Sequence, residues 1–238
     1  MTYCLGIKLK EGIVALSDTR ITSGNETSTA EKYKVFTQGK QNIFLMTSGL
    51  RSVRDKALTY FSEILNEKLS EFEKLYQAVN AFGEQVKRVA KEDKKALTES
   101  GLQFNISTIV GGQLSNDKEH KLYRIYPEGN WIEIGSGYPF AIIGNSGYGT
   151  PVLRRTINYD SSIKFALKTG FLSFDSTRVS SNDVDFPIDV IIFKKDSHEI
   201  RVKRFQESEL SSISKFWGEK LTKSVSEVPD DWIDEICF

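Results

Sequence analysis

Cysteine is scarce in this chain of 238 residues, which contains only Cys4 and Cys237. Two cysteines cannot form the disulfide framework of a small secreted protein, and we expect both thiols to stay reduced. The first residues show no basic segment followed by an apolar one, so a secretory signal peptide is not expected. The sequence therefore predicts a cytoplasmic protein.

An excess of charge of one sign and long apolar runs are also missing. The chain has 32 basic and 32 acidic residues, and this balance argues against a nucleic-acid partner, which usually requires a basic excess. It also removes the basic signal for an anionic membrane surface. The longest apolar runs, such as Phe140–Gly144 and Val190–Phe193, are too short to cross a bilayer. We therefore expect neither nucleic acid nor a membrane among the partners.

Several common catalytic signatures are absent as well. The glycine-rich segment Gly144–Gly149 lacks the Lys-Ser/Thr ending of a phosphate-binding loop, and it is better explained as a turn before a helix that opens at Pro151. There is no Gly-x-Ser-x-Gly motif, and no spacing of His, Cys and carboxylates fits a zinc site. The two histidines, His120 and His198, lie in predicted turns, and we expect both at the surface. The sequence thus predicts no metal and no cofactor.

What the sequence does contain is clear periodicity. Alternation over residues 2–9 predicts a strand, Lys10–Gly12 a turn and Ile13–Asp18 the second strand of a hairpin, followed by a polar loop over residues 21–31. Apolar residues at helical spacing predict two long helices, broken near Leu69. The other predicted strands are Tyr33–Phe36, Asn42–Thr47, Phe104–Val110, Lys121–Tyr126, Trp131–Ile134, Ile188–Phe193 and Glu199–Phe205. The other predicted helices are Val152–Asn158, Ile163–Asp175 and Leu210–Val225.

The order of these elements indicates an α+β fold. Strands follow one another as hairpins, which favours mainly antiparallel sheets, and the helices come in pairs. Paired helices disfavour a doubly wound parallel sheet and predict sheets sandwiched between helical layers. We expect one domain over residues 1–238, with a C-terminal helix and tail from about residue 207.

Thr2 is the first candidate catalytic residue. A small second residue allows methionine aminopeptidase to remove Met1, which leaves Thr2 with a hydroxyl nucleophile and its own α-amine as base. A free α-amine has a pKa of about 7.7–8.0, which suits proton transfer near neutral pH. Many chains begin with Met-Thr without a catalytic purpose, so both interpretations stay open on this signal alone.

Asp18 is the second candidate, because it ends an otherwise apolar strand. A three-residue turn centred on Glu11 would pair Thr2 with Arg20 and Cys4 with Asp18, so that Thr2, Asp18 and Arg20 share one face. A two-residue turn would reverse this parity. The Asp18 carboxylate would then either pair with Arg20 or hold a cation beside Thr2. Lys32 and Lys34 are the candidates for that cation, and a solvated strand lysine is the plain alternative.

Together these residues resemble the proteasome β-type N-terminal nucleophile hydrolases, and most of all their bacterial Anbu (ancestral β-subunit) branch. The resemblance rests on short landmarks that occur in order along most of the chain. They are Met1–Cys4 with Gly6, Ser17–Arg20, Lys32, Thr47–Gly49, Gly149–Leu153, Ala166–Leu167, Ser173–Thr177 and Pro187–Asp189.

The resemblance implies a four-layer α-β-β-α sandwich with Thr2 at the mouth of the cleft between the sheets. Thr2 would be the nucleophile, and Asp18 would orient Lys32, which lowers the pKa of the hydroxyl. Lys32 is chosen over Lys34 because its Lys-x-x-Val-Phe setting matches the branch better. The backbone N–H of Gly49 would form the oxyanion hole.

The resemblance also implies residues around the amine and the substrate. Ser146 would supply a hydroxyl near the amine, and Arg20 would give structural support. The family pattern has an acid followed three residues later by a serine; here Ser180 stands at the acid position and Asp183 at the serine position, unless Ser181 restores the pattern. Thr47 would line the pocket for the residue before the scissile bond.

Three functions are compatible with this resemblance. The first is a threonine-type peptidase that acts through an acyl-enzyme, and the second is a self-assembling scaffold subunit with weak or no catalysis. The third keeps the chemistry but acts on a non-peptide amide, as an amidase or transferase. The expected partners are a peptide or protein substrate, further copies of the chain in a ring or ring-like stack and, by analogy alone, an ATP-dependent unfoldase.

Overall fold

The computed structural model describes residues 2–23, 26–39, 41–233 and 236, and the chain divides into two units, Met1–Phe205 and Gln206–Phe238. The division lies next to residue 207, near which the sequence predicts the terminal helix and tail to begin. The second unit holds helix α5 (Glu207–Ser226) and the segment that follows it. Cys237 lies outside the described residues, as does Met1 with its predicted removal.

The first unit contains two five-stranded antiparallel sheets and one separate hairpin. The first sheet has the order β10 (Phe140–Gly144), β1 (Tyr3–Leu9), β2 (Gly12–Asp18), β11 (Ile188–Lys194), β12 (Glu199–Phe205). The second has the order β5 (Tyr33–Gln38), β6 (Gln41–Gly49), β7 (Ile106–Gln113), β8 (Lys121–Ile125), β9 (Trp131–Glu133). The separate hairpin pairs β3 (Arg20–Ser23) with β4 (Glu26–Thr29).

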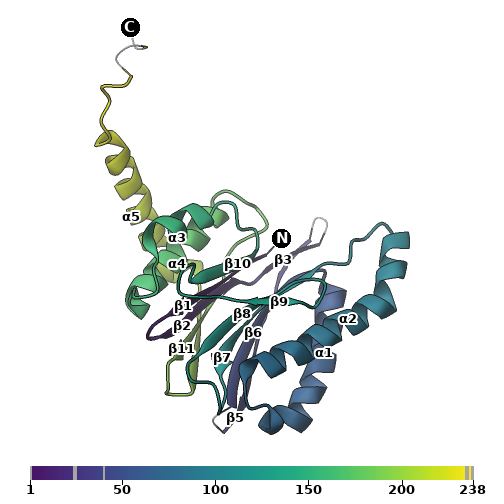
Figure 1. Cartoon of the computed structure of the whole chain (residues 1–238). Coiled ribbons are helices and arrows are strands. Elements are labelled where there is room, and N and C mark those ends of the chain that lie inside the picture. Colours follow the sequence, from purple (N-terminus) through teal and green to yellow (C-terminus); the bar gives the residue numbers. More distant parts are fainter. Residues whose placement is uncertain (1, 24–25, 40, 234–235, 237–238) are drawn as a thin grey trace. The chain divides into compact units, whose positions relative to one another are not determined.

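Helices cover the outer face of each sheet (Figure 1). Helix α1 (Arg51–Lys68), the short 3-10 turn η1 (Leu69–Glu71) and helix α2 (Leu75–Glu99) pack on the β5–β9 sheet, with the break between the helices where the sequence predicts it. Helices α3 (Thr150–Thr156) and α4 (Ile163–Arg178) lie on the other sheet. The architecture is therefore the predicted four-layer α-β-β-α sandwich with antiparallel sheets.

Alternating side chains in β6 show how the layers hold together. Ile43 and Leu45 belong to the core under α1 and α2, whereas Phe44 and Met46 belong to the core between the two sheets, together with Cys4. All five side chains are fully buried, and burial of a large aliphatic or aromatic side chain contributes about 1.5–3 kcal/mol. Because neighbouring residues of a strand point to opposite faces, one strand serves both cores.

The turn between β1 and β2 corrects the predicted register. Leu9 pairs directly with Gly12, so the turn has two residues and Cys4 faces Ser17, not Asp18. Gly12 has a φ of 152°, and a Cβ there would lie 2.1 Å from the carbonyl oxygen of Phe193. Because glycine tolerates this conformation and close approach, β2 begins at residue 12, directly after Glu11. The expected three-residue turn centred on Glu11 was therefore wrong.

Three smaller expectations also change. Residues 21–31 are not a plain loop, because the β3–β4 hairpin occupies most of them, and the list of predicted strands lacked β10. His120 is fully buried with its Nε2 2.7 Å from the carbonyl oxygen of Leu9, so its expected surface position was wrong, whereas His198 is half-buried in the turn between β11 and β12. Cys4 is buried.

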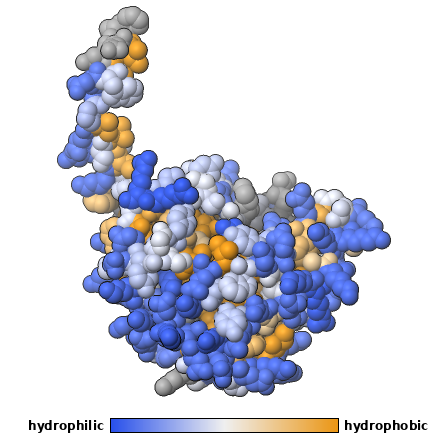
Figure 2. All heavy atoms as spheres, in the orientation of Figure 1, coloured by the Kyte–Doolittle hydropathy of each residue, from blue (hydrophilic) through white to orange (hydrophobic). Residues whose placement is uncertain are grey.

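Polar side chains dominate the face of the molecule seen in Figure 2, with apolar side chains gathered in small patches. Within the described ranges, no helix is both long enough and apolar enough to span a membrane.

Candidate active site

Thr2 lies directly before β1 and its backbone is held by the end of β10. The residue is 6% exposed, and its carbonyl oxygen accepts a hydrogen bond of 2.7 Å from the N–H of Asn145. Gly144 pairs with Tyr3 and has a φ of 87°; a Cβ there would lie 1.9 Å from the Thr2 carbonyl oxygen. Only glycine allows β10 to approach so closely, and this approach fixes the position of Thr2.

The residue after Thr2 connects it to a buried ion pair. Asp18 ends β2 and is fully buried, and its Oδ1 accepts a 2.8 Å hydrogen bond from the N–H of Tyr3. The same oxygen lies 2.7 Å from the Nζ of Lys32, which is 2% exposed and also donates to the carbonyl oxygen of Arg20 at 2.6 Å. One carboxylate oxygen thus holds both the start of β1 and a cation.

Lys32 reaches this position from the opposite sheet. It directly precedes β5, and its carbonyl oxygen accepts a 2.9 Å hydrogen bond from the N–H of Thr47 in β6. Its side chain then crosses to Asp18 at the end of β2 in the first sheet. Lys34 is exposed on β5, where it is the strand partner of Leu45 in β6. Lys32, and not Lys34, is therefore the lysine that contacts Asp18.

The electrostatics of this region follow from its burial. Burial raises the pKa of Asp18, and the Lys32 ammonium and the Tyr3 N–H both act against that rise. Burial also raises the pKa of the Cys4 thiol to about 12, so Cys4 stays protonated and is not a competing nucleophile. The Tyr3 hydroxyl donates to the Ser173 Oγ at 2.7 Å, and burial raises its pKa too.

Gly49 ends β6 on the opposite sheet. Its φ is 120°, and a Cβ there would lie 2.3 Å from the carbonyl oxygen of Asn105, so the position requires glycine. The neighbouring Ser48 places its Oγ 3.3 Å from where a Cβ of Gly144 would stand. The end of β6 therefore lies beside the backbone that holds Thr2.

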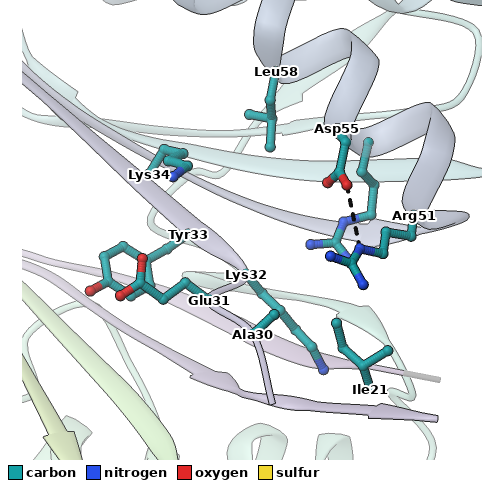
Figure 3. A pocket seen from close by; sticks show the side chains of 10 residues that line it. Ile21, Ala30, Glu31, Lys32, Tyr33, Lys34, Arg51, Asp55 and Leu58 are labelled. Atoms are coloured by element: carbon teal, nitrogen blue, oxygen red, sulfur yellow. Dashed lines mark hydrogen bonds and ion pairs between the residues drawn. The ribbon is translucent and has the colours of Figure 1, made fainter. Parts of the chain in front are cut away.

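A pocket of about 370 Å³ opens beside Lys32. Figure 3 shows Lys32 and Ile21 on one side of it and Leu58 and Asp55 of α1 on the other. The ten lining residues are Ile21, Ala30, Glu31, Lys32, Tyr33, Lys34, Arg51, Arg54, Asp55 and Leu58.

Thr47 is not one of the residues that line this pocket, and its role in a substrate pocket stays a prediction. It is buried, and its hydroxyl accepts a 3.0 Å hydrogen bond from the Nε of Arg54, which does line the pocket. Arg54 was missed as a site residue, although it carried a signal. It lies between Val53 and Ala57 on the buried face of a predicted helix, where an arginine interrupts the apolar pattern.

The residues expected around the amine lie on two loops, one after β10 and one between α4 and β11. Ser146 is exposed and lines a separate pocket of about 300 Å³, while Ser180 is exposed after α4 and Asp183 is half-buried in the loop before β11. Among the hydrogen bonds of the described residues, none joins the side chain of Ser146 or Ser180 to Thr2. Their roles stay predictions.

Arg20 forms an ion pair with Asp185 and not with Asp18. Its Nη1 pairs with the Oδ2 of Asp185 at 2.9 Å, while its backbone carbonyl oxygen accepts from Lys32. The ion pair between Arg20 and Asp18 that the sequence left open is therefore replaced by Asp18–Lys32. In the part of the chain that the structure describes, no three His, Cys, Asp or Glu residues cluster in a way that could hold a metal ion.

Solved structures similar to this chain include Anbu proteins from three bacteria. An Anbu mutant from Hyphomicrobium sp. strain MC1 is 29% identical with a TM-score of 0.88, covering 96% of this chain and 99% of that one. Anbu (ancestral β-subunit) from Yersinia bercovieri is 28% identical with a TM-score of 0.88, covering 95% and 97%. A structure described as the helical assembly of the Anbu complex from Pseudomonas aeruginosa is 27% identical with a TM-score of 0.88, covering 95% and 97%.

Among curated protein sequences, none matches this chain significantly. The sequence profile of the family described as "Proteasome subunit" matches residues 2–187, which is most of the chain. Together with the four-layer fold and the Anbu-like structures, this match shows that the chain belongs to the proteasome subunit family as an Anbu-like β-type member.

Proposed function

We propose that this protein is a threonine-type hydrolase of peptide or amide bonds, with Thr2 as nucleophile once Met1 has been removed. The observation that carries the proposal is the buried Asp18–Lys32 pair, which is hydrogen-bonded to the N–H directly after Thr2. A buried ion pair adds little to stability compared with apolar side chains of the same size. A role in chemistry therefore explains this pair better than a role in folding.

The first half of the reaction forms an ester. The Thr2 hydroxyl oxygen bonds to the substrate carbonyl carbon, and the hydroxyl proton passes to the α-amine of the same residue. That proton then goes to the leaving nitrogen as the carbon–nitrogen bond breaks. Lys32 favours both transfers, because a nearby positive charge lowers the pKa of the hydroxyl and keeps the amine neutral.

The second half frees the enzyme. Water gives a proton to the α-amine as it adds to the ester carbonyl. The ester bond then breaks, the acid is released, and the α-amine returns the proton to the Thr2 oxygen. In both halves the N–H of Gly49 is the donor expected to stabilise the oxyanion. The constrained end of β6 beside Gly144 supports this assignment.

A catalytically weak scaffold subunit is the second candidate function. It is favoured by the residue types at Ser180 and Asp183, which are exchanged relative to the acid and serine of the family pattern. In either case we propose that the chain self-associates, because the similar Anbu protein of Pseudomonas aeruginosa is described as a helical assembly. An ATP-dependent unfoldase partner stays a prediction by analogy.

Covalent labelling of the full-length protein tests the hydrolase directly. We would measure the intact mass before and after incubation with a peptide epoxyketone, and map any adduct by peptide sequencing. A single adduct on Thr2, absent from Thr2→Ala, is the expected result. Loss of Met1 without any adduct would contradict the hydrolase and favour the scaffold. If Met1 is retained, the same measurement is repeated after aminopeptidase treatment, and its result decides between the hydrolase and the scaffold. A substrate screen then distinguishes peptide substrates from other amides.

A further inference from the structure

Arg54 is a buried cation with spare hydrogen-bonding capacity. Arg54 is 6% exposed, and its Nε donates a hydrogen bond of 3.0 Å to the Thr47 hydroxyl. A guanidinium has five N–H groups, and among the described residues its two Nη atoms have no acceptor and no carboxylate partner within ion-pair distance. Since a buried arginine is almost always paired, the free side of this guanidinium points to a ligand with a negative charge.

The other charged residues around the pocket also leave unpaired positive charge. Glu31 and Asp55 are its acidic lining residues, and each already has a cation: Arg204 lies 3.8 Å from Glu31, and Arg51 lies 3.4 Å from Asp55. Lys32 is occupied by Asp18. Arg54 and the exposed Lys34 are the two lining cations that have no anionic partner in the described part of the chain. The pocket therefore attracts an anion.

The pocket is also placed and sized for one side chain of a substrate. Lys32 lines it and is joined through Asp18 to the N–H that follows Thr2, so two hydrogen bonds link the pocket wall to the residue next to the proposed nucleophile. We take the substrate residue whose carbonyl lies at the Thr2 hydroxyl to be the one whose side chain enters the pocket. About 370 Å³ accommodates a glutamate, whose methylene groups can pack on Ile21 and Leu58.

We propose that this pocket accepts an acidic side chain, so that peptides are cleaved after aspartate or glutamate, and that Arg54 determines this specificity. The inference rests on the proposed hydrolase function, because it takes Thr2 as the point of attack. Arg54 would bind the substrate carboxylate through its Nη groups, while its hydrogen bond to Thr47 keeps the guanidinium in place.

Binding to the full-length Thr2→Ala variant tests the pocket without any chemistry. Two acetylated tripeptide amides, ending in glutamate or in glutamine after two alanines, are titrated by calorimetry at pH 7. We expect the glutamate peptide to bind about ten- to a hundredfold tighter, as for a hydrogen bond to a charged group. Adding Arg54→Met should abolish this preference, whereas adding Arg88→Met, an exposed arginine on α2, should leave it intact.

A second variant keeps the test valid if Arg54→Met does not fold. Lys34 is exposed, and Lys34→Gln should fold and reduce the preference by about two- to fivefold, as for a partly screened charge. Equal binding of both peptides, no measurable binding of either, or a preference that survives Arg54→Met would overturn the proposal.

The two proposals fail in different ways. A glutamate preference without epoxyketone labelling of Thr2 would reject the hydrolase and keep the anion-binding pocket. Labelling of Thr2 without a glutamate preference would keep the hydrolase and reject the role of Arg54.

Discussion

Replacing Lys32 by methionine isolates the electrostatic part of the buried ion pair. Methionine keeps most of the side-chain volume but removes the ammonium, which lies 2.7 Å from Asp18 and 2.6 Å from the carbonyl oxygen of Arg20. Asp18 keeps the Tyr3 N–H as its donor but loses its counter-ion in a fully buried position. Breaking one side of a buried pair costs about 3–5 kcal/mol, and we expect a loss of that size at neutral pH.

The loss should depend on pH in a defined direction. Burial raises the pKa of Asp18 in the folded protein, and Lys32 opposes that rise, so Lys32→Met raises this pKa further. From the unfolded pKa of about 3.9 up to the raised folded value, the folded variant binds more protons than the unfolded chain. Its stability therefore falls as the pH rises through this window, and the destabilisation is smallest below about pH 4.

Urea unfolding followed by tryptophan fluorescence from pH 4 to pH 8 measures this dependence. Lys34→Met, at an exposed position, is the control and should change the free energy of unfolding by less than about 0.5 kcal/mol at every pH. Adding Asp18→Asn to Lys32→Met should recover part of the loss at neutral pH. A destabilisation that is independent of pH would refute the reasoning, since it would then reflect packing and not charge.

Two further predictions concern the backbone and the side chain next to Thr2. Gly144→Ala should destabilise the protein by at least about 1–3 kcal/mol in thermal unfolding, because Gly144 has a φ of 87° and contacts the Thr2 carbonyl oxygen. Gly147 has open space around it, so Gly147→Ala is the control and should not destabilise the protein. Equal effects of the two substitutions would contradict the argument. Tyr3→Phe should cost only about 1 kcal/mol, since Ser173 still donates to the Gly149 carbonyl oxygen at 2.8 Å, and a larger loss in urea unfolding would show that the hydroxyl has a further partner.

The element order could be read from the sequence because periodicity reports burial on one face. The long helices, the break near Leu69 and the final hairpin of β11 and β12 were predicted correctly for this reason. The turn at Lys10–Glu11 was not, because its length depends on the backbone of Gly12 and its contact with Phe193, a residue remote in sequence. Such long-range contacts leave no local pattern.

The candidate site was also predicted in part, for the same reason. The choice of Lys32 over Lys34 agrees with the contact to Asp18, although the hairpin register used to place Asp18 was wrong. Asp18 still meets Lys32 because the lysine crosses from the other sheet, a relation that no strand pattern encodes. Arg54 was overlooked because a single charged residue in an apolar helix pattern reads as a boundary of the buried stripe, and only the fold places it at the pocket.

The central claim is that the Lys32 ammonium activates Thr2, and the rate of Thr2 labelling in two lysine variants tests it most directly. The full-length chain, Lys32→Ala and Lys34→Ala would be incubated with an epoxyketone whose terminal residue is uncharged, after Met1 removal is verified by mass. The account predicts near-complete loss of labelling in Lys32→Ala, with correct folding checked by circular dichroism, and an unchanged rate in Lys34→Ala. Labelling that persists in folded Lys32→Ala, or that is lost only in Lys34→Ala, would contradict it.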